Sequence, residues 1–154
     1  MRVKRVIRGA LLAVGWLALS LSWAAAGQVT YFVGGDKEAG KAVAAEAGGQ
    51  WVKNLTKAFA KSAQDINAGG PVTVVMMVAA GEYDGDLGSG AYALPQYSNP
   101  SGSLIIRGGY DASFATRDPF GTPSMVVTIP GRSAELWSFP RNCKLERFIV
   151  DGVL

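Results

Sequence analysis

The sequence predicts a mostly β protein whose strands stack as a parallel β-helix, a solenoid of repeated coils. Three short apolar runs, centred on Ile105, Val127 and Ile149, follow one another at intervals of 22 residues, and each meets a Gly or Pro three residues after its centre. A fixed interval of this size is typical of solenoids, in which each coil buries its apolar face against the next. The leucine-rich repeat has a similar period, but its L-x-x-L-x-L core is missing. The remaining alternative is that three strands are equally spaced by chance.

Residues 1–26 have the features of a secretory signal peptide. Four basic residues lie within the first eight positions, and an uncharged, mostly apolar stretch and Ala24-Ala25-Ala26 follow. This order of basic, apolar and small residues indicates export. We expect cleavage after Ala26 and an extracellular, cell-surface or periplasmic location, with membrane contact only through the signal peptide. The alternative is an uncleaved anchor, because the apolar stretch approaches the ~18 residues that span a bilayer.

The composition argues against several classes of function and of site. The formal charge of +3 comes from the signal peptide, because the 15 basic residues less those four leave 11 against 12 acidic residues, a net charge of −1. We therefore expect no nucleic-acid partner. The chain has no His, which excludes triads and zinc sites that need imidazole. The single Cys143 cannot form an internal disulfide, and export without disulfides is typical of a bacterial protein.

Residues 27–70 are predicted to form an N-terminal strand, a loop and a helix. Residues 29–33 are β-branched and aromatic and end at Gly34-Gly35, which predicts a strand and a turn. Residues 35–50 are rich in Gly and Ala and predict a loop with one weak helical turn. Residues 51–66 place apolar side chains three and four residues apart, which predicts an amphipathic helix. The residues expected to end it are Asn67, Gly69, Gly70 and Pro71.

Residues 71–154 are predicted to form the first coils of the β-helix. Residues 72–80 are uncharged and almost entirely apolar, as in a strand buried on both faces, and residues 81–102 have the composition of a loop. The last apolar run lies four residues before Leu154, so an end there would leave a strand edge open. We therefore expect a truncated β-helix from a longer protein, or a short one that self-associates through its open end.

Several stretches carry a resemblance to a known superfamily. They are the helix within residues 51–66, the strand with its Ala80-Gly81-Glu82-Tyr83 turn, and the later segments 106–111 and 148–152. Together they resemble the N-terminal cap and first coils of pectate-lyase-like, right-handed parallel β-helix proteins of bacterial surfaces. The resemblance implies that the helix plugs the open end of the solenoid, with Trp51, Leu55, Phe59 and Ile66 facing the first coil.

Two functions remain open at this point. One is a structural, adhesive or surface-binding segment with no catalytic site of its own, whose partners are polysaccharides or cell-surface glycans. The other, implied by the resemblance, is the N-terminal part of a polysaccharide lyase or glycoside hydrolase with its active site beyond residue 154. The sequence leaves enzymatic activity undecided, and we assign no catalytic or cofactor-binding residue.

Three polar or aromatic patterns are candidate sites. Glu82, Asp84 and Asp86 lie close together beside glycines and could hold calcium, although the EF-hand spacing fails and an acidic turn is the alternative. Residues 35–41 match G-x-x-x-x-G-K, but position 42 is Ala, so we expect a solvated Gly-rich loop instead of a phosphate site. Four tyrosines could stack on sugar rings or cover the core: Tyr83, Tyr92, Tyr97 and Tyr110.

Overall fold

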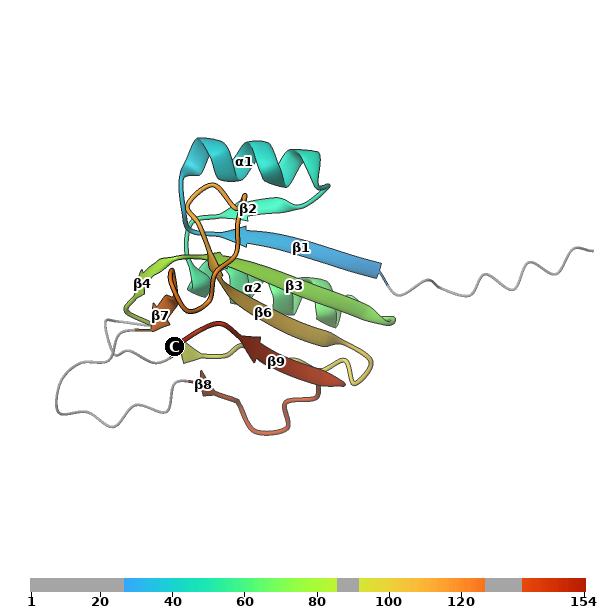
Figure 1. Ribbon diagram of the computed structural model, residues 1–154. Coiled ribbons are helices and arrows are strands. Elements are labelled where there is room, and N and C mark those ends of the chain that lie inside the picture. Colours follow the sequence, from blue (N-terminus) through green and yellow to red (C-terminus); the bar gives the residue numbers. More distant parts are fainter. Residues whose placement is uncertain (1–26, 86–91, 127–136) are drawn as a thin grey trace, which may run out of the picture.

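The chain folds as an α/β domain around an open, all-parallel sheet (Figure 1). The computed structural model describes residues 27–85, 92–126 and 137–154, so the predicted signal peptide lies outside the described residues. The main sheet has five strands in the order β2-β1-β3-β6-β9. With helices on both faces, this is a Rossmann-like architecture. No helix of the described residues is long and apolar enough to cross a bilayer.

The strands of the main sheet are β1 (Gly27–Val33), β2 (Gln50–Val52), β3 (Val72–Ala79), β6 (Ser103–Tyr110) and β9 (Arg147–Asp151). Two further pairs of short parallel strands are β4 (Gly81–Tyr83) with β7 (Ser124–Val126), and β5 (Tyr92–Ala93) with β8 (Trp137–Ser138). The strands predicted at 29–33 and 72–80 are confirmed as β1 and β3. The loop predicted over 81–102 is wrong in part, because it contains β4 and β5.

Two helices connect the first three strands of the sheet. Helix α1 (Lys37–Glu46) follows β1, and helix α2 (Leu55–Asn67) follows β2. The side chains of Asp36 and Asn54 cap their N-termini by accepting hydrogen bonds from backbone amides in the first turn. Helix α2 starts four residues later than predicted, because residues 50–52 pair with β1 as a strand.

The helices cover opposite faces of the sheet. Alternate residues of a strand point to opposite faces, so Tyr31 and Val33 of β1 face α2 while Phe32 faces α1. On the α2 side, Leu55, Phe59 and Ile66 are fully or almost fully buried against β1, β3 and β6. On the α1 side the cluster is smaller and consists of Phe32, Ala44, Ala79 and Phe114.

The predicted β-helix is wrong, and so is the family resemblance drawn from it. The sheet has α1 and α2 packed on its two faces and is open at β2 and β9, so the described part of the chain has no solenoid sheet. The 22-residue repeat also fails, because Ile105 pairs directly with Ile149. Val127, the centre of the middle run, lies outside the described residues, and Val126 beside it belongs to β7, which pairs with β4. Buried parallel strands are short and apolar in both architectures, so strand composition alone did not separate them.

The predicted roles of the two segments before β3 change accordingly. Residues 35–50 contain a ten-residue helix where a loop was predicted. Helix α2 lies on the face of the sheet and does not plug the end of a solenoid. Trp51, assigned to that plug, lies in β2 and packs with the α1-side cluster. The described residues form no β-helix end for the predicted self-association, and self-association itself stays a prediction.

Candidate functional site

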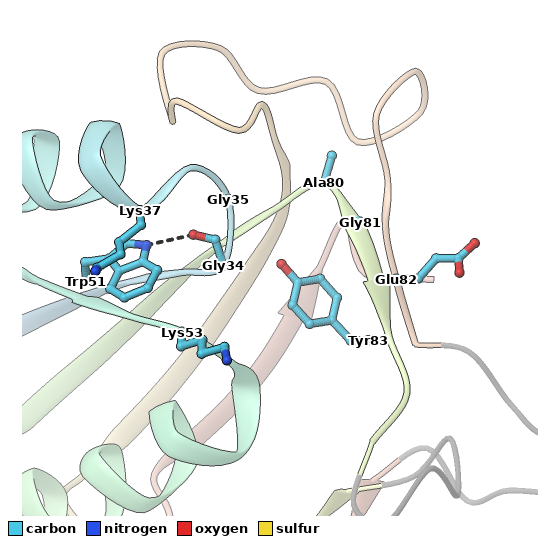
Figure 2. A pocket seen from close by; sticks show the side chains of 9 residues that line it. All are labelled: Gly34, Gly35, Lys37, Trp51, Lys53, Ala80, Gly81, Glu82 and Tyr83. Carbon is cyan, nitrogen blue, oxygen red and sulfur yellow. Dashed lines mark hydrogen bonds between the residues drawn. The ribbon is translucent and has the colours of Figure 1, made fainter.

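The carboxyl ends of β1, β2 and β3 border a cleft with a volume of about 630 Å³. Strands β2 and β3 lie on opposite sides of β1, so the order of strand addition reverses at β1. In open parallel sheets, ligands bind outside the carboxyl ends of the strands at such a reversal. Nine residues line the cleft (Figure 2): Gly34, Gly35, Lys37, Trp51, Lys53, Ala80, Gly81, Glu82 and Tyr83.

Trp51 forms one side of the cleft and is held there by a hydrogen bond. Its indole Nε1 donates to the carbonyl oxygen of Gly34 at 2.8 Å, which ties the ring to the turn after β1. Helix α1 approaches the indole so closely that a Cβ atom at Gly40 would collide with the ring. The polar edge of the indole is therefore occupied, and what Trp51 offers a ligand is aromatic surface.

Tyr83 lies on the opposite side of the cleft, at the end of β4 (Figure 2). Its hydroxyl donates to the carbonyl oxygen of Ala79 at 2.9 Å. Burial raises the pKa of Tyr83 to about 12, with a smaller contribution from Tyr92. The hydroxyl therefore stays protonated at neutral pH. It also packs against Gly34, where φ is +74° and a Cβ atom would collide with it.

The charged groups at the cleft are two lysines and one glutamate. Lys53 follows β2 and extends toward the side occupied by Tyr83, whereas Glu82 points away from the cleft (Figure 2). Lys37 lies 4.0 Å from Glu38, a solvent-exposed pair that holds it weakly. Lys53 forms no ion pair with any carboxylate that the structure describes. The cleft thus presents positive charge between two aromatic side chains.

The G-x-x-x-x-G-K pattern begins in the turn after β1 and continues into α1. The expected solvated loop is therefore wrong, and both glycines have packing roles. Gly35 has a φ of +67° and lies against the Ala112 carbonyl, and Gly40 lies against Trp51. Lys41 is exposed and pairs with Glu38 at 3.7 Å. These contacts account for the pattern without a bound phosphate.

The structure describes two of the three residues predicted as calcium ligands. Glu82 lies in β4 and Asp84 directly follows it, and both are exposed. Asp86 lies outside the described residues. Within the described ranges, no three acidic, histidine or cysteine side chains gather in a way that could hold a metal ion.

Of the four tyrosines considered from the sequence, only Tyr83 lines the cleft. Tyr92 and Tyr97 are buried in the main core, and Tyr110 packs with the α1-side cluster. Sequence reasoning missed Trp51, Lys37 and Lys53 because it placed them in a helix or loop. The signal that could have found them is a strand ending in Gly-Gly directly before a capped helix.

Comparisons with known proteins leave the cleft to be interpreted from its own geometry. No protein family, no curated protein and no solved structure matches this chain.

Proposed function

We propose that this protein is an exported binding domain that holds an acidic sugar, as found in polysaccharides and cell-surface glycans, in the cleft between Trp51 and Tyr83. The observation that carries the proposal is the pairing of these aromatic side chains with Lys53 at the strand-order reversal. Aromatic rings pack on the apolar faces of sugar rings, and an ammonium group pairs with a carboxylate. A volume of about 630 Å³ lies within the range of small-molecule sites.

The lining of the cleft favours binding over hydrolysis of a glycosidic bond. Glycosidases generally place two carboxyl groups on either side of the scissile bond. Among the nine lining residues only Glu82 carries a carboxylate, and its side chain points away from the cleft (Figure 2). The predicted signal peptide supports a ligand met outside the cytoplasm, where saccharides are abundant and nucleotides are scarce.

The proposal is tested by titrating the purified protein with digalacturonate while following the indole N–H resonance of Trp51. We expect saturable binding that weakens about tenfold to a hundredfold in Lys53→Ala, because one charge-assisted hydrogen bond contributes on the order of 1.5–3 kcal/mol. Lys57→Ala is the matched control, since Lys57 is an exposed lysine on α2 outside the cleft. Absence of binding, or equal losses in the two variants, would show that the cleft is not the site.

A further inference from the structure

The turn from β1 into α1 lies where a phosphate group would bind in a sheet of this strand order. In doubly wound α/β folds, phosphate groups accept hydrogen bonds from free amides at the N-terminus of the helix after the first strand. Here that turn is Gly34-Gly35-Asp36, and both glycines line the cleft. The ligand class accepted by the cleft therefore depends on whether those amides are free.

Three of the six amides from residue 34 to residue 39 are taken by the protein itself, among them that of Gly34, which donates to the Val52 carbonyl at 2.9 Å. The Asp36 carboxylate accepts from the Ala39 amide at 2.8 Å, and the Gly40 amide donates to the Asp36 carbonyl at 2.8 Å. The amide of Asp36 donates to the Ala112 carbonyl, also at 2.8 Å. The Asp36 carboxylate thus occupies the position at the helix terminus that an anion would take, and its charge opposes a second anion there.

The cations that remain for a ligand lie on the cleft wall. Lys53 is unpaired among the described carboxylates, and Lys37 is shared with Glu38. Because Glu82 points away from the cleft (Figure 2), the negative charge that opposes the lysines at this turn is that of Asp36, the N-cap of α1. This balance suits a ligand with one negative charge placed near Lys53 and opposes a phosphate dianion.

We infer that the cleft selects a sugar carboxylate over the corresponding sugar phosphate, and that Asp36 is the residue that determines this selectivity. The inference rests on the proposed function, because it names the acidic group that the cleft accepts. Asp36 acts by filling the helix terminus and by repelling a dianion, and it does not itself touch the sugar.

The test compares three sugars that share a glucopyranose ring and differ at C6: glucuronate, glucose 6-phosphate and glucose. With the unmodified protein we expect glucuronate to bind at least about fivefold more tightly than either of the others. Asp36→Asn keeps a good N-cap while removing the charge, so it should strengthen glucose 6-phosphate binding about fivefold or more and change glucuronate binding less. Glu46→Gln, which removes an exposed charge from the other end of α1 and leaves the cap and Lys37 unchanged, is the control.

The outcomes separate the two proposals. If glucose 6-phosphate binds the unmodified protein as tightly as glucuronate, the selectivity inference is wrong while the proposed function stands. Equal gains for glucose 6-phosphate in Asp36→Asn and Glu46→Gln would remove the specific role of Asp36. If none of the three sugars binds, the proposed function itself fails, and the inference fails with it.

Discussion

The hydroxyl groups of Ser62 and Tyr97 lie 2.8 Å apart in the buried core, where they join α2 to the segment that follows β5. Ser62 donates its own proton to the carbonyl of Phe59, so Tyr97 is the donor in the pair. Each hydroxyl group therefore has a partner, although both residues are fully buried. The pair is one of the few polar links inside an otherwise apolar cluster.

Removing the two hydroxyl groups should have unequal effects on stability. Ser62→Ala leaves the buried Tyr97 hydroxyl without its acceptor and should lower the free energy of unfolding by about 1–3 kcal/mol. Tyr97→Phe leaves Ser62 bonded to Phe59 and should lower it by about 1 kcal/mol. In the double variant the loss should be smaller than the sum, as denaturant unfolding of all four proteins can measure. Strict additivity would show that the two groups do not interact.

Alkaline pH should destabilise the fold through its buried tyrosines. Burial raises the pKa of both Tyr83 and Tyr97 to about 12, whereas a tyrosine in the unfolded chain titrates near 10. The contribution of these two tyrosines to the free energy of unfolding is therefore fully present below pH 10 and is lost as the pH rises toward 12. Each tyrosine should contribute a slope of up to about 1.4 kcal/mol per pH unit in that window. Denaturant unfolding of the Tyr83→Phe variant should show a shallower slope than the unmodified protein, and an unchanged slope would contradict this.

Gly40→Ala tests the packing of α1 against Trp51. In an isolated helix the change would stabilise by up to about 1 kcal/mol, but here the added Cβ atom collides with the indole ring. Overpacking of this kind costs about 1–3 kcal/mol, so we expect net destabilisation and altered tryptophan fluorescence. Gly27→Ala is the control, because a Cβ atom there meets nothing within 4 Å. A stabilised Gly40→Ala variant would mean that α1 is not packed on Trp51.

Acid should loosen the loop that begins at Asp111. Its carboxylate accepts hydrogen bonds from the hydroxyl and amide groups of Thr116 and Ser113 and from the amide of Ala115. These bonds, that of the Thr116 hydroxyl foremost, hold the pKa of Asp111 well below its usual range. An aspartate in the unfolded chain takes up its proton at about pH 3.9. The contribution of ionised Asp111 to the stability of the loop is therefore present above that pH and is lost as the pH falls further.

This loop matters for the cleft because the carbonyl of Ala112 accepts the amide of Asp36. We expect amide exchange of residues 113–116 to accelerate relative to the β3 amides as the pH is lowered from 5 to about 2.5, after correction for intrinsic exchange. Asp111→Asn should remove most of this pH dependence. Asp84→Asn, which changes an exposed carboxylate outside the loop, should leave it intact. Equal behaviour of the two variants would exclude Asp111 as the cause.

The elements that sequence reasoning found share one property, which is a local pattern strong enough to be seen in isolation. Strands β1 and β3 are uninterrupted apolar or β-branched runs, and α2 has a clear apolar face of Leu55, Phe59 and Ile66. Helix α1 was missed because its only buried residues are Gly40 and Ala44, and such small side chains give a weak amphipathic signal. It is stabilised by its Asp36 cap and by contact with Trp51.

Patterns of neighbouring residues were enough to locate most of the long apolar strands and one helix, and they predict export, because these features depend on residues close together along the chain. Which strands are neighbours became known from the three-dimensional fold, since pairing Ile105 with Ile149 requires contacts 44 residues apart that no local pattern encodes. The cleft depends on the same non-local choice. Trp51 and Lys53 come from β2 and the residue after it, and Tyr83 comes from β4, which follows β3; they meet only because β2 and β3 pair on opposite sides of β1.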